Sequence, residues 1–101
     1  MNYNMKLQEL IKQKRNEIIH IAARHGASHV RLIGSVARNE GTEQSDIDFL
    51  VRFEPNRSLF DHISLIQELE ALLNCKVDVA SEAGLRERVR ETVEVESVVL
   101  L

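Results

Sequence analysis

The fold is decided by one stretch, Leu32-Ile33-Gly34-Ser35-Val36-Ala37-Arg38 followed after a short gap by Ser45-Asp46-Ile47-Asp48-Phe49-Leu50-Val51. The stretch predicts a strand, a glycine turn, a short polar loop and a second strand that carries two aspartates. Alternate residues of a strand share a face, so Asp46 and Asp48 are expected on one face, about 6.5–7 Å apart at Cα. The residues of opposite parity are apolar and are expected to face a core: Ile47, Phe49 and Val51.

The two halves of this stretch predict complementary chemistry. Two carboxylates this close repel each other unless a cation lies between them, and hard oxygen ligands suit Mg²⁺. Gly34 lets the backbone approach a ligand, and Ser35 adds a hydroxyl beside backbone N–H groups that can cradle phosphate oxygens. A phosphate cradle beside a carboxylate pair is what metal-assisted phosphoryl transfer requires. Each half is common alone, but the two together in this order and spacing are far more specific.

The combined motif resembles that of a known superfamily. Gly34-Ser35-x-x-Arg38 followed by Ser45-Asp46-Ile47-Asp48 is similar to the signature of the DNA polymerase β-type nucleotidyltransferases. The short chain and the run from Gly34 to Arg38 resemble its minimal, MNT-type branch, and the resemblance extends from the first expected helix nearly to the end of the chain. Asn39 departs from this branch, which usually has a second glycine after the arginine.

The resemblance also implies a set of site residues. Asp46, Asp48 and Asp78 would be the catalytic carboxylates and would hold two Mg²⁺ ions, with ATP as the substrate. Asp78 lies between two valines, and a lone carboxylate with apolar neighbours needs a partner. A structural ion pair with an arginine is the alternative for Asp78.

Four further residues are expected to bind the nucleotide. Gly34 and Ser35 would hold the β- and γ-phosphates, and Ser45 would join them. Arg38 would either contact the triphosphate or make a structural salt bridge.

Composition limits the alternatives. A length of 101 residues predicts a single domain over 1–101, and a net charge of -3 gives no overall basic field that would attract nucleic acid. No signal peptide and no apolar run of about 18 residues is visible, so neither export nor a membrane span is expected. Cys75 has no second cysteine to pair with, which suits a reducing cytoplasm.

Hydrophobic periodicity predicts an α+β fold in which helices pack on a mixed sheet of three or four strands, as the resemblance also implies. The expected stripe on the longest central helix comprises Leu59, Ile63, Ile66, Leu69 and Leu73. The apolar tail at 95–101 must enter the core, add a strand or be covered by another chain. Helices are expected at 4–25, 36–39, 58–73 and 81–94, and strands at 30–33, 46–53 and 76–80.

The acceptor of the nucleotide is the open question. The catalytic core takes up nearly the whole chain, so a partner protein is expected to supply the acceptor. Minimal proteins of this type resemble the antitoxin of HEPN/MNT toxin–antitoxin pairs, which implies transfer of AMP from ATP to a tyrosine hydroxyl of a HEPN ribonuclease toxin. Two alternatives are a non-catalytic antitoxin that masks the toxin, and a small-molecule nucleotidyltransferase acting as a homodimer.

One further pattern is a competing signal. The R-x4-H spacing of Arg15 and His20 matches that of HEPN ribonucleases. Those domains are all-helical whereas this chain continues into strands, so a chance match is the better interpretation.

Overall fold

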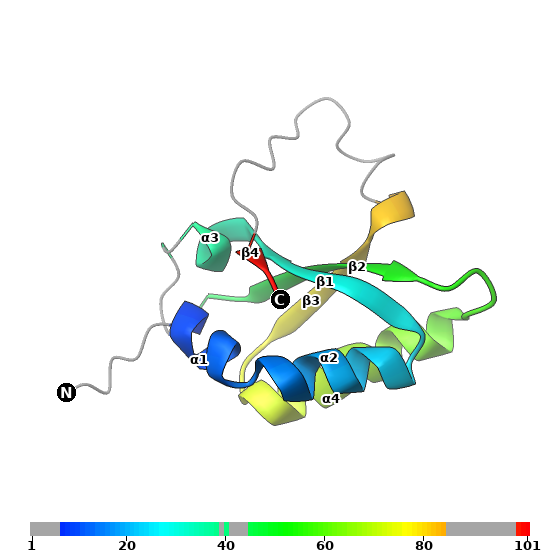
Figure 1. The fold of residues 1–101 in the computed structure, drawn as a ribbon, viewed down its shortest axis with the longest axis horizontal. Helices are drawn as coiled ribbons and strands as arrows, with labels where there is room; N and C mark the ends of the chain where they lie inside the picture. Colours follow the sequence, from blue (N-terminus) through cyan, green and yellow to red (C-terminus); the bar gives the residue numbers. More distant parts are fainter. Residues whose placement is uncertain (1–6, 39, 41–44, 85–98) are drawn as a thin grey trace.

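The computed structural model describes residues 7–38, 40, 45–84 and 99–101, and the fold is α+β (Figure 1). Two helices precede the first strand, a short helix follows it, and one long helix connects the second and third strands. The elements are α1 (Leu7–Gln13), α2 (Arg15–Arg24), β1 (Ala27–Ile33), α3 (Gly34–Ala37), β2 (Ile47–Phe53), α4 (Leu59–Leu73), β3 (Val77–Ser81) and β4 (Val99–Leu100).

The strands form one mixed sheet in the order β3-β2-β1-β4. β1 pairs antiparallel with both β2 and β4, whereas β2 and β3 run parallel. The parallel pair is connected through α4, as a parallel connection requires. Figure 1 shows α1, α2 and α4 together on one face of this sheet. The expected three- to four-stranded mixed sheet packed with helices is therefore confirmed.

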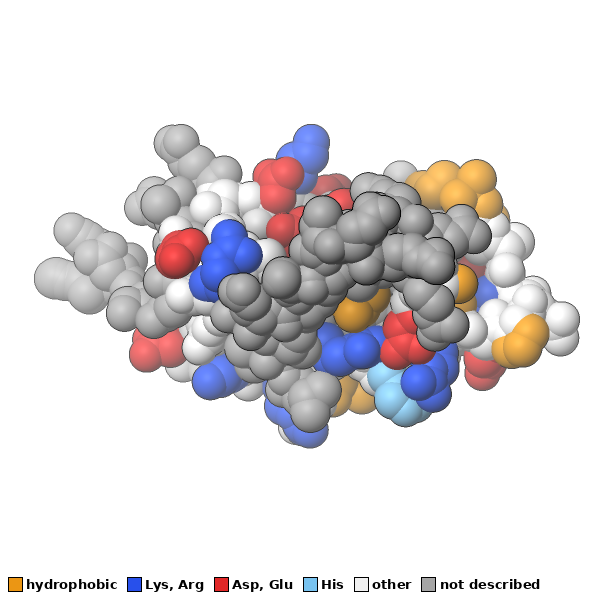
Figure 2. Space-filling model, turned by 90° about the horizontal axis from the view of Figure 1, so that it is seen from above, with side chains coloured by type: hydrophobic (Ala, Val, Ile, Leu, Met, Phe, Trp, Pro, Cys, Tyr) orange, Lys and Arg blue, Asp and Glu red, His pale blue; other side chains and the backbone are white. Residues whose placement is uncertain are grey.

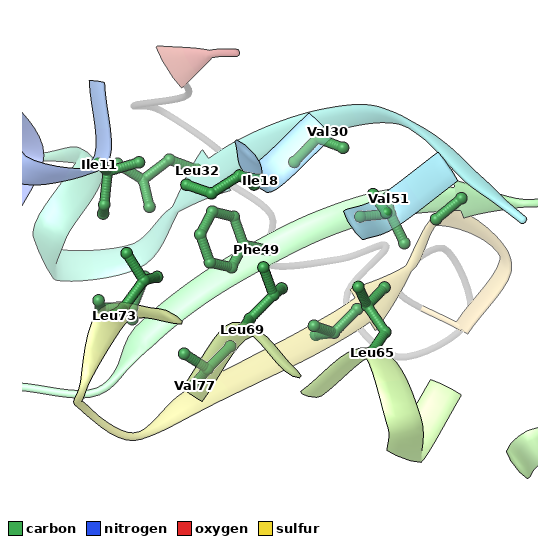
Figure 3. Packing of buried hydrophobic residues seen from close by; sticks show 14 of the residues in the cluster. Ile11, Ile18, Val30, Leu32, Phe49, Val51, Leu65, Leu69, Leu73 and Val77 are labelled. Atoms are coloured by element: carbon green, nitrogen blue, oxygen red, sulfur yellow. The ribbon is translucent and has the colours of Figure 1, made fainter. Parts of the chain in front are cut away.

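The core lies between that face and the helices (Figure 3). Phe49 on β2 is fully buried, as are Ile18 of α2 and Leu65 of α4. Ile47, Phe49 and Val51 of β2 belong to this core, as their parity predicted, and this places Asp48 on the opposite face.

The first helix was predicted as one unit over 4–25, and this prediction is wrong. The helix is interrupted at Lys14, whose φ of -98° and ψ of 15° separate α1 from α2. The hydrophobic pattern runs through the break, since Ile11 and Ile18 are both buried, and no proline or glycine marks it. Gly26, with φ +76°, follows the end of α2, and a stop at this glycine was predicted correctly.

The first strand begins three residues earlier than predicted, at Ala27. His29 has a φ of 53°, and the register between β1 and β2 shifts between Ser28 and Arg31. This irregularity exposes two consecutive residues, Ser28 and His29, so the alternating pattern is visible in the sequence only from Val30 onward.

The predicted short helix at 36–39 is placed too late. α3 begins at Gly34, so Gly34 and Ser35 form its first turn and do not precede it. β2 begins at Ile47, one residue after the predicted start, and β3 occupies Val77–Ser81, one residue beyond the predicted 76–80. The ends of β2 and β3 differ from the prediction by one residue, and each strand keeps its predicted alternation of faces.

The predicted start and end of α4 are confirmed, but part of its predicted buried stripe is wrong. Asn74 ends the helix with a left-handed φ of 56°, and Ser58 precedes it as its N-cap. Leu59 and Ile63 are exposed, and the buried positions are Leu65, Leu69 and Leu73. Leu69 and Leu73 were predicted correctly, Ile66 is half-buried against the core, and Leu65 takes the buried position that the prediction missed.

Near its end the chain returns to the sheet. Of the tail, Val99–Leu100 forms β4 beside β1, and the Leu101 N–H donates to the Val30 carbonyl at 3.1 Å. The added strand is thus the observed outcome for these residues. Residues 82–84 begin the predicted last helix. The remaining predictions for 4–6, 39, 41–44 and 85–98 lie outside the described residues. Within the described parts, no helix has the length and apolar character needed to cross a membrane.

Candidate active site

The three predicted carboxylates lie at one end of the sheet. Asp48 on β2 and Asp78 on β3 are direct partners in the parallel register, which places their Cα atoms about 4.8 Å apart. Asp46 lies two residues before Asp48, just ahead of the strand. Asp48 is half-buried, whereas Asp46 and Asp78 are exposed. The sheet therefore brings Asp78 to the carboxylate pair from a position 30 residues later in the chain.

Gly34 closes the other side of Asp48. Ile33, the last residue of β1, is the register partner of Asp48 in the antiparallel ladder, and Gly34 follows it with a φ of +78°. A β-carbon built on Gly34 would lie 2.5 Å from Asp48 Oδ2, which is far inside van der Waals contact. Glycine is required here both for the backbone conformation and for the approach of the carboxylate.

The other predicted nucleotide-binding residues surround α3. Ser35 is half-buried in the first turn of α3, and its carbonyl accepts the Glu40 N–H at 2.8 Å. Arg38 is exposed, and its Nε donates to Glu40 Oε1 at 3.1 Å, so of the two roles expected for it the structure shows the ion pair. Ser45 is half-buried on the approach to β2.

A residue that the sequence did not single out holds α3 in place. Gln8 on α1 donates from Nε2 to the carbonyls of Val36 and Ala37, at 3.2 Å each. These carbonyls lie at the end of a four-residue helix, where the backbone N–H groups of a further turn are missing, so a side-chain donor stabilises the turn. No spacing in the sequence links Gln8 to residues 28 and 29 positions away, which is why pattern analysis missed it.

Electrostatics distinguish Asp48 from its neighbours. Burial raises the pKa of Asp48 above its ordinary value, and the negative charges of Asp78 and Asp46 raise it further. A divalent cation between these carboxylates would remove both penalties, and an all-oxygen donor set fits Mg²⁺. Within the described residues, no three acidic, histidine or cysteine side chains are already gathered in metal-binding geometry. The carboxylates of Asp46, Asp48 and Asp78 nevertheless fit Mg²⁺ by the chemistry of their oxygens and by their neighbouring positions on the sheet.

The same sheet face carries a separate polar cluster at its other end. Glu82 accepts hydrogen bonds from Arg31 and from Arg52 Nε, the latter at 2.9 Å, and the Arg52 hydrogen bond is the main reason that the pKa of Glu82 is lowered. Figure 2 views this face and shows acidic side chains grouped in one part and basic side chains with a histidine in another.

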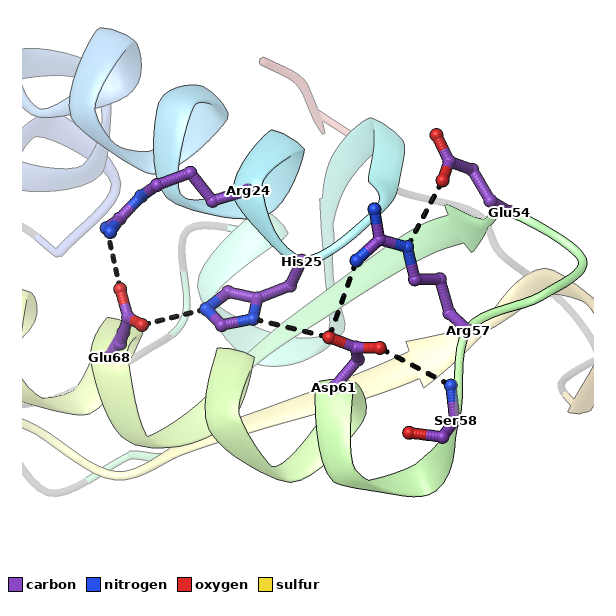
Figure 4. Close-up of polar contacts among 7 residues, drawn as sticks. All are labelled: Arg24, His25, Glu54, Arg57, Ser58, Asp61 and Glu68. Atoms are coloured by element: carbon purple, nitrogen blue, oxygen red, sulfur yellow. Dashed lines mark hydrogen bonds and ion pairs between the residues drawn. The ribbon is translucent and has the colours of Figure 1, made fainter.

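A second network lies between the helices (Figure 4). His25, at the end of α2, contacts two carboxylates of α4. Its Nε2 forms a hydrogen bond with Glu68 Oε2 at 2.8 Å, and its Nδ1 lies 3.7 Å from Asp61 Oδ1. Arg24 also contacts Glu68, at 2.7 Å, and Arg57 lies 3.6 Å from Asp61. The contacts of Arg24 and His25 join the end of α2 to α4, and none of the contacts in this network involves a residue predicted for the site.

The R-x4-H pattern forms no comparable cluster. Arg15 Nη2 donates to the Leu101 carbonyl at 3.3 Å, and His20 is exposed on α2. Within the described residues these two side chains make no hydrogen bond or ion pair with each other. Arg15 has a structural contact with the end of the chain, in keeping with a chance match.

Comparison with known proteins identifies relatives of similar sequence. A protein of Methanocaldococcus jannaschii, provisionally named a protein adenylyltransferase, is 37% identical over 90% of this chain and 98% of its own. The protein adenylyltransferase MntA of Thermococcus cleftensis is 40% identical over 69% of this chain and 71% of its own.

Solved structures agree. One that is provisionally described as a minimal nucleotidyltransferase is 46% identical, covers 93% of this chain and 95% of its own, and superposes with a TM-score of 0.80. A tri-AMPylated Shewanella oneidensis HEPN toxin in complex with an MNT antitoxin matches at 20% identity and a TM-score of 0.64, with 88% of this chain and 69% of that chain covered. The latter likeness concerns the fold.

The family model described as the nucleotidyltransferase domain matches residues 8–100, which include all seven predicted site residues. The expected superfamily is confirmed, and this chain belongs to the nucleotidyltransferase domain family.

Proposed function

We propose that this protein transfers AMP from ATP to a hydroxyl group, that of a tyrosine, on a partner HEPN ribonuclease toxin and thereby acts as its antitoxin in the cytoplasm. The observation that carries this proposal is the pairing of Asp48 with Asp78 beside Asp46, with Gly34 packed against Asp48. Two relatives support the choice of reaction by name, and a neighbour of the same fold is an MNT antitoxin bound to an AMPylated toxin.

Each site residue has a role in this reaction. Asp46, Asp48 and Asp78 would hold two Mg²⁺ ions, which supply charge neutralisation for the triphosphate and activation of the acceptor hydroxyl. Gly34 and Ser35 would bind the β- and γ-phosphates, with Ser45 beside them. Arg38 is exposed and pairs with an exposed glutamate, Glu40, so it can exchange this partner for a phosphate at little cost.

The transfer itself exchanges a phosphoanhydride bond of ATP for a phosphodiester bond to the acceptor oxygen. The Asp78 carboxylate accepts the proton of the acceptor hydroxyl, and the oxygen forms a bond to the α-phosphorus of ATP. The bond between the α-phosphorus and the oxygen that bridges to the β-phosphate breaks, and that oxygen leaves with its electron pair as part of pyrophosphate. The position of Asp78, on the opposite side of β2 from Gly34, supports this role.

The test is intact-mass spectrometry of the HEPN partner after incubation with this protein, Mg²⁺ and ATP. The partner is expected to gain the mass of one or more AMP groups. Asp78→Asn should slow this gain by about 100-fold or more while MgATP affinity changes little, because general-base catalysis typically contributes this much.

Asp61→Asn is the matched control, since Asp61 lies on α4 in a structural network and its change should leave the rate near that of the wild type. An unmodified partner with the wild-type protein would refute the proposed transfer. A wild-type rate in Asp78→Asn would show that Asp78 is structural.

A further inference from the structure

Lys76 lies next to the carboxylates at the outer strand of the described sheet. The Ile47 N–H donates to the Lys76 carbonyl at 3.0 Å, so the ladder between β2 and β3 continues one residue before Val77. This continuation places Lys76 opposite Asp46, one step from the pair Asp48 and Asp78. Because alternate residues share a face, Lys76 and Asp78 lie on the same side of the sheet. Lys76 is therefore a fourth charged residue of the site.

Lys76 makes no ion pair with an acid among the residues that the structure describes. In the described parts of the chain, no carboxylate lies within ion-pair distance of its ammonium group, and its side chain is exposed. The arginines on the same face differ, because Arg31 and Arg52 both bind Glu82.

The position of Lys76 along the sheet separates it from the nucleotide side. Gly34 follows β1, Asp48 is on β2, and Lys76 precedes β3, so β2 lies between Gly34 and Lys76. If the triphosphate lies at Gly34 and Ser35, the acceptor must approach from the side of β3. An acidic acceptor approaching there would meet three carboxylates, and Lys76 is the cation placed to attract it.

We propose that Lys76 is an acceptor-binding residue whose ammonium group pairs with a carboxylate of the partner protein close to the hydroxyl that is modified. This inference rests on the proposed function and adds to it the chemistry of the acceptor segment, namely an acidic stretch around the modified residue. The contact fixes the acceptor and leaves the nucleotide bound as before.

The test is steady-state transfer of labelled AMP to the purified HEPN partner by wild type, Lys76→Gln and Lys76→Arg, with acceptor and ATP varied separately. Lys76→Gln should raise the KM for the acceptor about tenfold, as expected for loss of a charge-assisted hydrogen bond. The kcat and the MgATP affinity measured by calorimetry should not change. Lys76→Arg should restore most of the acceptor affinity.

Lys12→Gln is the matched control, because Lys12 is an exposed lysine on α1, and this variant should behave like wild type. Weaker MgATP binding in Lys76→Gln with an unchanged acceptor KM would assign Lys76 to the nucleotide and overturn the proposal. No change in either would also overturn it.

Failure of the proposed function gives a different result. If wild type transfers no AMP, calorimetric binding of the partner to wild type and Lys76→Gln without ATP still tests the contact. The contact then predicts about tenfold weaker binding of Lys76→Gln. Equal binding would exclude it.

Discussion

At Gly34, two independent constraints act on one residue. Its φ of +78° is unfavourable for any side chain, and its α-carbon faces the Asp48 carboxylate so closely that a methyl group would lie 2.5 Å from Oδ2. The left-handed backbone at Gly34 and the half-buried acid therefore constrain each other's positions, so a side chain at residue 34 must displace the Asp48 carboxylate.

Gly34→Ala should therefore affect both stability and binding. We expect a loss of about 1–2 kcal/mol in unfolding free energy from the left-handed backbone and a loss of MgATP binding from displacement of Asp48. Gly26→Ala is the control, since Gly26 has a φ of +76° but the three atoms nearest to its added β-carbon all belong to the flexible Arg57 side chain. Chemical denaturation and calorimetry should show reduced stability in both variants and reduced MgATP affinity in Gly34→Ala alone. An MgATP affinity of Gly34→Ala equal to that of wild type would contradict the close packing of Gly34 against Asp48.

At Asp48, the stability of the metal-free protein and the proposed binding of Mg²⁺ are in conflict. Its pKa is raised in the folded protein, so the protonated form is favoured by folding and stability is lost as the pH rises above the unfolded value of about 3.8. Metal-free Asp48→Asn should consequently be more stable than wild type at neutral pH, and the difference should shrink toward pH 4. Denaturation across this pH range in the presence of a chelator measures it, and Mg²⁺ should stabilise wild type more than the variant. A less stable variant at pH 7 would show that other contacts of the Asp48 carboxylate dominate.

The sequence predicted the acids and the glycine of this site but not all of its residues. Asp46 and Asp48 were predicted to share a face from strand parity, whereas the role of Asp78 was implied by the resemblance to the superfamily. Gln8 and Lys76 could not be found this way, because their roles depend on tertiary contacts and on the register of β2 with β3. Strand register between segments joined by a long helix is not encoded in either segment alone.

At the level of elements, predictability followed local chemistry. The end of α4 at Asn74 and the stop at Gly26 were predictable because these residues take left-handed conformations that end helices. The break at Lys14 and the irregularity at His29 were not, since neither residue type favours the conformation it adopts. Such positions are determined by packing of the neighbouring segments.

α1 and α3 form one such packed unit. Gln8 bonds the last two carbonyls of α3, which begins with the residues proposed to hold the phosphates. Gln8→Ala should leave the carbonyls of Val36 and Ala37 without this donor, at a cost of about 1 kcal/mol, and should weaken MgATP binding by loosening α3.

The matched control for α1 is Gln13→Ala, at the exposed end of the same helix. Thermal unfolding and calorimetry would separate the two variants. Unchanged MgATP affinity in Gln8→Ala would show that α3 holds its position without α1.

On the molecule as a whole, exposed apolar side chains lie outside the candidate active site. Leu59, Phe60 and Ile63 at the start of α4 are exposed apolar side chains, although the described helices are otherwise packed on the sheet. A protein that binds its target tightly can inhibit it without chemistry, so formation of a complex does not distinguish an enzyme from a mask.

The two models differ in what remains after separation. A modifying antitoxin predicts that the HEPN partner stays inactive once this protein has been removed, because the AMP is bound covalently, and that a small amount of antitoxin inactivates an excess of toxin when MgATP is present. A mask predicts inhibition that requires equal amounts of the two proteins, does not depend on ATP and reverses on separation.

The variant Asp46→Ala/Asp48→Ala should bind the partner but fail to inactivate it lastingly. It should fold, since Asp46 is exposed, Asp48 faces away from the helical core and neither contributes to that core. The measurement is ribonuclease activity of the repurified partner, with circular dichroism to confirm that the variant is folded. Full recovery of activity after separation from wild type, together with complete neutralisation by the double variant at equal amounts, would establish the mask.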